Sequence, residues 1–285
     1  MLPQAGTMAH SFVQSFDSEY EAFKAYAEIY PSDCTLLIDT YDTLASGIKN
    51  AIAVFNEVIV PKGYRPKAVR LDSGDLAYLS KKVREMLDEA GFSDCKICGT
   101  NELDEYVISS LLQQDAKIDL FGVGENLITA KSDPVFSGVY KLVAIEKDNK
   151  IIPKIKITDN TSKIVNPGFK KLYRFYDKET AHAIADLIAL NDEVISEDSY
   201  VIFDPKNPWK KKELSNYYMK ELQVPIFKNG ELVYTSPVLK EIALFAQSEL
   251  NTFWDEIKRM QNPHIYYVDL SEKLWNLKHE LLNDK

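Results

Sequence analysis

The chain has 285 residues, of which 45% are hydrophobic and 27% are charged, so it can bury a sizeable core in one large domain or two ordinary ones. Its formal net charge of -9 argues against a nucleic-acid-binding protein, which usually carries a basic excess. No apolar run approaches the roughly 20 residues that span a bilayer, and residues 1–10 lack the layout of a signal peptide. We therefore expect a cytoplasmic protein without nucleic-acid or membrane partners.

The cysteines support the same location. Cys34, Cys95 and Cys98 form a sparse, odd-numbered set, which fits a reducing compartment better than a disulfide scaffold. Cys95 and Cys98 have the C-x-x-C spacing of a metal site, but no second cysteine pair exists to complete about four zinc ligands. We interpret them as two thiols on a strand.

A strand–helix pattern repeats along the first half of the chain, with a repeat of roughly 25–30 residues that is typical of a parallel α/β sheet or barrel. Its apolar strands are predicted at 34–39, 68–72, 96–101 and 118–124, and its amphipathic helices at 43–60, 76–90 and 103–113. Residues 20–30 form one more candidate helix. Because a closed barrel has eight strands and only about four units are visible, the segment is either an open sheet or part of a barrel.

The pattern changes after residue 143. Strands are predicted at 138–145, 154–157 and 171–176, a hairpin at 224–234, and helices at 237–260 and 271–282. We therefore expect an α/β protein with a partial barrel-type catalytic domain at 1–150. A mixed region of antiparallel strands and helices should follow at 151–285.

Polar residues and glycines lie at or just past the ends of all four predicted parallel strands. In such sheets ligands bind beyond the carboxyl ends of the strands, so a shared pocket explains the set better than chance. Its members are Asp39, Arg70, Asp72, Ser73, Gly74, Gly99, Asn101, Gly122 and Gly124. Carboxylates hold Mg²⁺, a guanidinium suits carboxylate or phosphate, and glycines let backbone amides approach a phosphate. The set predicts a magnesium-assisted site for a phosphorylated sugar or nucleotide.

Four runs then resemble, in order and approximate spacing, the signature of nicotinate phosphoribosyltransferases. They lie at 6–12, 37–43 and 69–76, and at 121–124 followed by 138–143; less specific similarity continues from 166 to the C-terminus. The resemblance implies a type II phosphoribosyltransferase with a TIM-like barrel. It also implies transfer of phosphoribosyl from phosphoribosyl pyrophosphate to nicotinate, with Mg²⁺ and coupled ATP hydrolysis, to give nicotinate mononucleotide.

Motif matching assigns roles to individual residues. His10 matches the histidine that ATP phosphorylates during turnover, and a histidine suits this task because its neutral nitrogen is nucleophilic. Arg70 and Asp72 match positions around nicotinate and ribose, and Asp39 lies in the same pocket.

Two loops complete the assignment. Gly99, Thr100 and Asn101 match positions near the ribose hydroxyls, and Gly122, Gly124 and Glu125 match the cradle for the 5'-phosphate. Glu125 departs from the threonine common in the family, so its backbone amide is the expected phosphate ligand.

The sequence also lacks counterparts of the family's N-terminal domain and first barrel strands. We therefore expect a truncated chain with little turnover of its own, and the resemblance implies a homodimer. Two alternatives remain open at this point: a site for nicotinamide or quinolinate, and a catalytically silent binding or assembly module.

Overall fold

A computed structural model of the chain describes residues 7–135, 137–159 and 163–284. They divide into two compact units, the first ending at Ser137 and the second beginning at Gly138. Residues 138–150, which the sequence groups with the first domain, therefore belong to the second unit. The first residue of the 6–12 run lies outside the described residues.

The first unit contains a four-stranded, fully parallel sheet in the order β1-β2-β3-β4. The strands are β1 (Thr35–Leu37), β2 (Ala68–Leu71), β3 (Lys96–Gly99) and β4 (Leu120–Phe121). Leu37 pairs with Arg70, and Arg70 pairs with Cys98, so the carboxyl ends of neighbouring strands are level. The predicted parallel α/β pattern is confirmed, and it aligns the strand ends that carry the candidate site.

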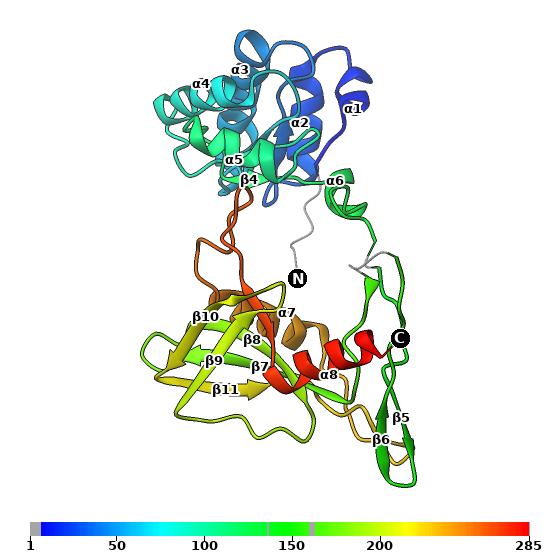
Figure 1. Cartoon of the computed structure of the whole chain (residues 1–285). Coiled ribbons are helices and arrows are strands. Elements are labelled where there is room, and N and C mark those ends of the chain that lie inside the picture. Colours follow the sequence, from blue (N-terminus) through cyan, green and yellow to red (C-terminus); the bar gives the residue numbers. More distant parts are fainter. Residues whose placement is uncertain (1–6, 136, 160–162, 285) are drawn as a thin grey trace. The chain divides into compact units, whose positions relative to one another are not determined.

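The first unit also contains helices (Figure 1). They are α1 (His10–Gln14), α2 (Glu19–Ile29), α3 (Ile48–Val54), α4 (Leu76–Glu89), α5 (Glu105–Gln113) and α6 (Glu125–Ile128). Helix α3 continues on both sides into wider or tighter turns, η1 (Thr43–Gly47), η2 (Phe55–Ile59) and η3 (Val60–Lys62). Each long helix begins after a polar residue whose side chain accepts a backbone amide hydrogen, as Asp75 does for α4 and Asp104 for α5.

The continuous helix from Thr43 to Lys62 is long and apolar enough to cross a membrane by length and composition alone. Its apolar stripe is nevertheless packed in the core, where Ile48, Ala51 and Phe55 are fully buried. Packing against α2 and α4 therefore accounts for its hydrophobic character.

The second unit is built mainly from strands. They are β5 (Ala144–Lys147), β6 (Lys150–Pro153), β7 (Lys170–Asp177), β8 (Ala183–Leu190), β9 (Ser199–Asp204), β10 (Asn207–Ser215), β11 (Tyr217–Glu221), β12 (Phe227–Lys228), β13 (Glu231–Leu232) and β14 (Tyr267–Leu270). A mixed sheet has the order β11-β7-β8-β14, with β14 parallel to β8, and β9 and β10 form a hairpin. The helices are α7 (Leu239–Asn251) and α8 (Glu272–Asn283), and α8 packs on β8.

Several predictions for this unit are corrected. The strand predicted at 154–157 is wrong, because residues 154–157 are not in a strand. The strand pairing ends at residue 153, in the β5–β6 hairpin whose turn is at Asp148 and Asn149. Residues 138–143 are not in a strand, and the helix predicted at 237–260 ends at Asn251. The hairpin at 224–234 is confirmed, with its turn at Asn229 and Gly230 in the left-handed region.

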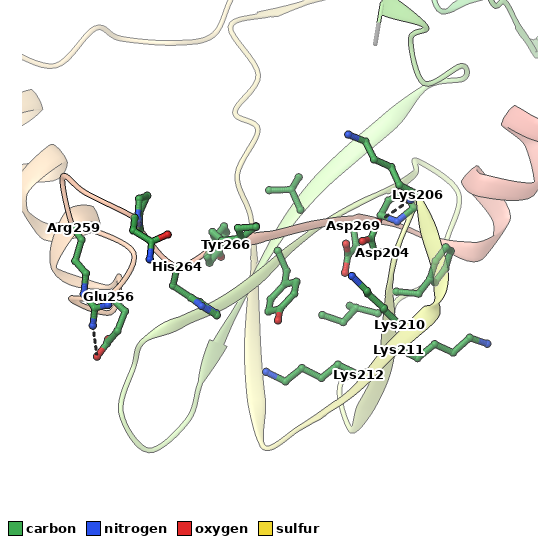
Figure 2. A pocket seen from close by; sticks show the side chains of 18 residues that line it. Asp204, Lys206, Lys210, Lys211, Lys212, Glu256, Arg259, His264, Tyr266 and Asp269 are labelled. Carbon is green, nitrogen blue, oxygen red and sulfur yellow. Dashed lines mark hydrogen bonds and ion pairs between the residues drawn. The ribbon is translucent and has the colours of Figure 1, made fainter. Parts of the chain in front are cut away.

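A buried ion pair ties the sheet of the second unit to the segment before β14. Arg174 on β7 donates two hydrogen bonds to Asp186 on β8, at 2.8 and 3.0 Å. The Tyr266 hydroxyl donates to the same carboxylate at 2.8 Å, and the Arg174 guanidinium lies 4.9 Å from the Phe253 ring. These contacts anchor residues 253–266 against the sheet, beside a cavity of about 840 Å³ between the β9–β10 hairpin and β14 (Figure 2).

Candidate active site

The loops after β1, β2 and β3 meet because their strands end at the same edge of the sheet. The amide of Thr100 donates to the carbonyl of Leu71 at 2.8 Å, and the amide of Ile38 donates to the carbonyl of Arg70 at 3.1 Å. These bonds continue the ladder past the last paired residues. The side chains that follow each strand are therefore held close together.

Asp72 is the centre of this cluster. One of its oxygens accepts a hydrogen bond from Arg70 Nη2 at 2.7 Å and is in contact with the Thr100 hydroxyl. Arg70 Nε donates to the same hydroxyl at 2.9 Å, which closes a three-residue ring. Burial raises the pKa of Asp72, but the Thr100 and Arg70 hydrogen bonds and the charges of Arg70 and His10 outweigh it and lower that pKa below its usual value. Asp72 is thus held as a carboxylate.

Asp39 shapes the turn after β2 and keeps one oxygen free. Its Oδ2 accepts hydrogen bonds from the Asp72 amide at 2.8 Å and from the Ser73 hydroxyl at 2.7 Å. Its Oδ1 is buried without a hydrogen-bond partner among the described residues. A buried acceptor of this kind is unfavourable unless a ligand or water supplies a donor.

His10 reaches the cluster from the first helix. The Thr7 hydroxyl donates to the carbonyl of Thr35 at 2.9 Å, and Met8 and Val13 are buried, so the chain is fixed on both sides of His10. His10 Nδ1 lies 3.1 Å from the Thr40 hydroxyl, and Nε2 lies 3.5 Å from the second Asp72 oxygen. The imidazole is therefore oriented by two partners while 39% of its side chain stays exposed.

The glycine-rich loop after β4 contacts the cluster at one of its two glycines. A Cβ on Gly122 would lie 2.5 Å from the Thr100 methyl group, whereas a Cβ on Gly124 would meet nothing within 4 Å. Gly124 directly precedes the short helix α6, of which exposed Glu125 is the first residue. The Asn126 side chain donates to the carbonyls of Glu102 and Leu103, which joins this loop to the one after β3.

The structure thus brings together six predicted site residues in one hydrogen-bonded group: His10, Asp39, Arg70, Asp72, Ser73 and Thr100. Gly99 and Gly122 lie next to this group: the Gly122 amide donates to the Gly99 carbonyl at 2.9 Å, and Gly122 packs close to Thr100. Asn101, with a φ of 82°, and Glu125 make no side-chain contact to this group within the described parts of the chain. Thr40 is a residue the prediction missed; its position beside Asp39 at a strand end was the available signal.

The described residues contain no group of three or more His, Cys, Asp or Glu side chains arranged to hold a metal ion. Cys98 lies on β3 and Cys95 just before it, and burial raises the pKa of Cys95 to about 12. This thiol therefore stays protonated and unreactive near neutral pH.

A cluster of arginine, carboxylates and glycines at the carboxyl edge of a parallel sheet is the arrangement of ligand-binding α/β proteins. Comparison with known proteins shows which family of α/β proteins this chain resembles. Residues 169–278 match the family described as the nicotinate phosphoribosyltransferase C-terminal domain. Nicotinate phosphoribosyltransferase from Bacillus subtilis is 46% identical over 99% of this chain and 57% of its own length. The enzyme of that name from Caenorhabditis elegans is 36% identical over 93% of this chain and 48% of its own.

Two solved structures share the fold. The crystal structure of human nicotinic acid phosphoribosyltransferase superposes with a TM-score of 0.77 at 24% identity, covering 98% of this chain and 62% of its own. That of nicotinate-nucleotide pyrophosphorylase from Pyrococcus furiosus gives a TM-score of 0.55 at 23% identity, covering 87% and 55%. The chain belongs to the nicotinate phosphoribosyltransferase family, and it spans about half the length of the curated relatives it matches.

Proposed function

We propose that this chain carries the site at which nicotinate and phosphoribosyl pyrophosphate form nicotinate mononucleotide and pyrophosphate. The observation that supports it most is the hydrogen-bonded group at the strand ends, formed by Arg70, Asp72, Thr100 and His10. The sequence that carries this group is 46% identical to the nicotinate phosphoribosyltransferase of Bacillus subtilis. The four-stranded parallel sheet is then part of a TIM-like barrel. Its outer strands β1 and β4 would pair with strands from the rest of such a barrel.

Each side chain has a task in this reaction. In the described structure Arg70 Nε donates a hydrogen bond to Thr100 and Nη2 donates one to Asp72. Its Nη1 is therefore left to donate to the carboxylate of nicotinate. Asp72 is held ionised and stabilises the positive charge that develops on the ribose ring as pyrophosphate leaves. The free Oδ1 of Asp39 accepts a hydrogen bond from a ribose hydroxyl.

Phosphate contacts come from the backbone of the loop after β4. The amides at the start of α6 have no acceptor one turn earlier, so those of Glu125 and Asn126 would donate to the 5'-phosphate. Gly124 leaves open space for this approach, and the exposed Glu125 side chain stays in solvent.

Mg²⁺ fits this donor set only as an ion shared with the substrate. Asp39 and Asp72 offer two carboxylates, and the described residues provide no cluster of three ligands, so substrate phosphates and water would complete the coordination. When bound, the ion neutralises charge on the departing pyrophosphate.

ATP coupling is assigned to His10. The γ-phosphoryl group of ATP would transfer to an imidazole nitrogen and ADP would leave. The hydrogen bond between His10 Nδ1 and the Thr40 hydroxyl, together with the nearby Asp72 carboxylate, would orient the ring. The proposal extends to a cytoplasmic homodimer, which is consistent with the three free cysteines and with large exposed apolar side chains such as Trp209 and Phe245.

Ligand binding tests the site without requiring turnover by this chain. Titration calorimetry with phosphoribosyl pyrophosphate and Mg²⁺, followed by nicotinate, should show binding that Arg70→Gln weakens about tenfold or more for nicotinate. Lys67→Gln, on a residue paired with Asp33 outside the cluster, is the charge-matched control and should bind like the parent. Equal nicotinate affinity in Arg70→Gln and the parent would remove Arg70 from the site.

The histidine is tested separately with γ-labelled ATP. The expected product is an acid-labile, alkali-stable phosphoryl group on the protein that disappears in His10→Ala and persists in His279→Ala. Label that survives in His10→Ala would place the phosphoryl group elsewhere.

A further inference from the structure

The side chain of Thr100 has a use that neither the strand-end pattern nor the proposed reaction assigns to it. The family resemblance places this residue near the ribose hydroxyls. In the structure, however, its hydroxyl accepts a hydrogen bond from Arg70 Nε at 2.9 Å. Its only proton is directed to the Asp72 carboxylate and to the Leu71 carbonyl, which lies 3.1 Å away. The hydroxyl therefore acts on neighbouring residues of the site and has no proton left to donate to a ribose.

This hydroxyl fixes the direction of the Arg70 guanidinium. Arg70 donates to Thr100 through Nε at 2.9 Å and to Asp72 through Nη2 at 2.7 Å. Because a guanidinium is planar, holding two of its nitrogens also fixes the direction of the third. That third nitrogen, Nη1, is the one that the proposed function directs to the carboxylate of nicotinate. Without Thr100, the Asp72 contact alone would hold the group, and the guanidinium could swing about it.

The methyl group of Thr100 packs on the loop after β4. A Cβ added to Gly122 would lie 2.5 Å from this methyl carbon, so the glycine backbone lies directly against it. The Gly122 amide also donates to the Gly99 carbonyl at 2.9 Å, which joins the two loops at this point. Since the methyl group and the hydroxyl branch from one Cβ, a rotation that moves the first also moves the second.

The same two loops are joined again further along the chain. The Asn126 side chain donates to the carbonyl of Glu102 at 3.2 Å and to that of Leu103 at 3.1 Å. Asn126 lies in the first turn of α6, whose free amides are the proposed contacts of the 5'-phosphate. The loop after β3 is thus fastened to the phosphate loop on both sides of Thr100. A change in the phosphate loop therefore reaches Thr100 and, through its hydroxyl, Arg70.

We propose that Thr100 is a positioning residue that couples the phosphate loop to the arginine for nicotinate, with its hydroxyl orienting Arg70 and its methyl group seating the loop after β4. The identity of the two ligands rests on the proposed function. A phosphate bound on the loop holds Thr100, and with it Arg70, in place, so nicotinate has less to order when it binds. The coupling is reciprocal, and each ligand raises the affinity for the other by the same factor.

Two substitutions at this position separate the two ends of the side chain. Thr100→Val keeps the branched shape and a methyl group toward Gly122 but removes the hydroxyl. Thr100→Ser keeps the hydroxyl and removes the methyl group. Thr252→Val, on a threonine of the second unit whose hydroxyl donates to the Glu249 carbonyl, is the control for loss of a hydroxyl. Thermal melting checks that all three variants fold.

The first measurement uses no ligand. The Nε–H proton of Arg70 is followed by NMR in the full chain, and its resonance is assigned by its loss in Arg70→Gln. It should exchange with water slowly in the parent, in Thr100→Ser and in Thr252→Val. In Thr100→Val it should exchange about tenfold faster or more, because its acceptor is gone. Equal exchange rates in Thr100→Val and the parent would overturn the positioning role.

The second measurement is calorimetric titration of nicotinate with and without ribose 5-phosphate, which carries the 5'-phosphate but no leaving group. In the parent, ribose 5-phosphate should tighten nicotinate binding about fivefold or more. Thr100→Val should weaken nicotinate binding about tenfold under both conditions. Thr100→Ser should bind nicotinate like the parent when it is added alone, but should lose the tightening by ribose 5-phosphate.

The outcomes separate this inference from the proposed function. A parent that binds neither ligand contradicts the proposed function and the coupling, whereas faster exchange at Arg70 in Thr100→Val would still establish the positioning role. A parent that binds both ligands without tightening overturns the coupling, and so does equal tightening in Thr100→Ser and the parent. Nicotinate binding that is weakened equally in Thr100→Ser and Thr100→Val overturns the division between hydroxyl and methyl group.

Discussion

Gly122 and Gly124 have the same role in the sequence motif but opposite surroundings, so alanine at each should act differently. At Gly122 the new methyl group would lie 2.5 Å from the Thr100 methyl, well inside contact distance. Thr100 has little freedom to turn away, because its hydroxyl accepts from Arg70 and contacts Asp72. Gly122→Ala must therefore either break these bonds or move the strand end.

The size of the effect follows from these two routes. Overpacking in a well-packed site costs about 1–3 kcal/mol, and losing hydrogen bonds to charged groups costs about as much. We expect Gly122→Ala to lower the unfolding free energy of the first unit by about 2 kcal/mol, a drop in Tm of roughly 4–8 °C. At Gly124 nothing lies within 4 Å of an added Cβ, so Gly124→Ala should change Tm little.

Calorimetric melting of both variants measures their stability. Titration with phosphoribosyl pyrophosphate measures the affinity of the proposed phosphate cradle. Gly124→Ala should fold normally yet bind phosphoribosyl pyrophosphate more weakly, because its methyl group enters the open space in which we propose that the phosphate binds. Equal Tm in Gly122→Ala and the parent would refute the packing argument. Unchanged binding in Gly124→Ala would refute the cradle and leave the packing argument intact.

Two further changes test other parts of the chain. Burial and the Asp204 carboxylate raise the pKa of Asp269 to about 6, against about 3.9 when unfolded. Its contribution to stability is therefore full below pH 4 and lost as pH rises through 6, on the order of 3 kcal/mol in total. Asp269→Asn should flatten this dependence in urea unfolding between pH 4 and 7; parallel curves for variant and parent would contradict it. A Cβ on Gly47 would lie 1.8 Å from the Ile38 carbonyl oxygen, so Gly47→Ala should lose about 3 kcal/mol or more in the same assay; a midpoint equal to the parent's would show that the helix can move away.

The parallel sheet was predictable because its signals are local. Each strand is a short apolar run followed by a polar residue, and in a parallel sheet all such ends share one edge. Asp39, Arg70 and Asp72 could therefore be grouped from spacing alone. The family resemblance added His10, which no periodicity links to the sheet.

The contacts between these residues were not predictable in the same way. Whether Asp72 meets Arg70, Thr100 or His10 depends on strand register and on the path of each loop, which local composition does not encode. Thr40 was missed for this reason, because what relates it to the site is its hydrogen bond with His10, a residue 30 positions away in the sequence.

The second unit shows the opposite difficulty. Strand β8 is a nearly continuous apolar run, and β10 is rich in lysine, so neither alternates as a half-buried strand should. Both form because antiparallel partners, β7 for β8 and β9 for β10, satisfy their backbones. The lysine run of β10 looks in sequence like an ordinary solvated surface.

Charge position, and not charge content, therefore decides what each surface can bind. A run of three lysines is divided by the strand into one that meets two aspartates, one that turns away and one that faces a cavity. The two glycines of the loop after β4 are divided in the same manner, into one that packs on Thr100 and one that opens on free space. In both cases adjacent or near-adjacent residues of one type acquire different surroundings from the backbone, so single substitutions at neighbouring positions are the most informative tests of this protein.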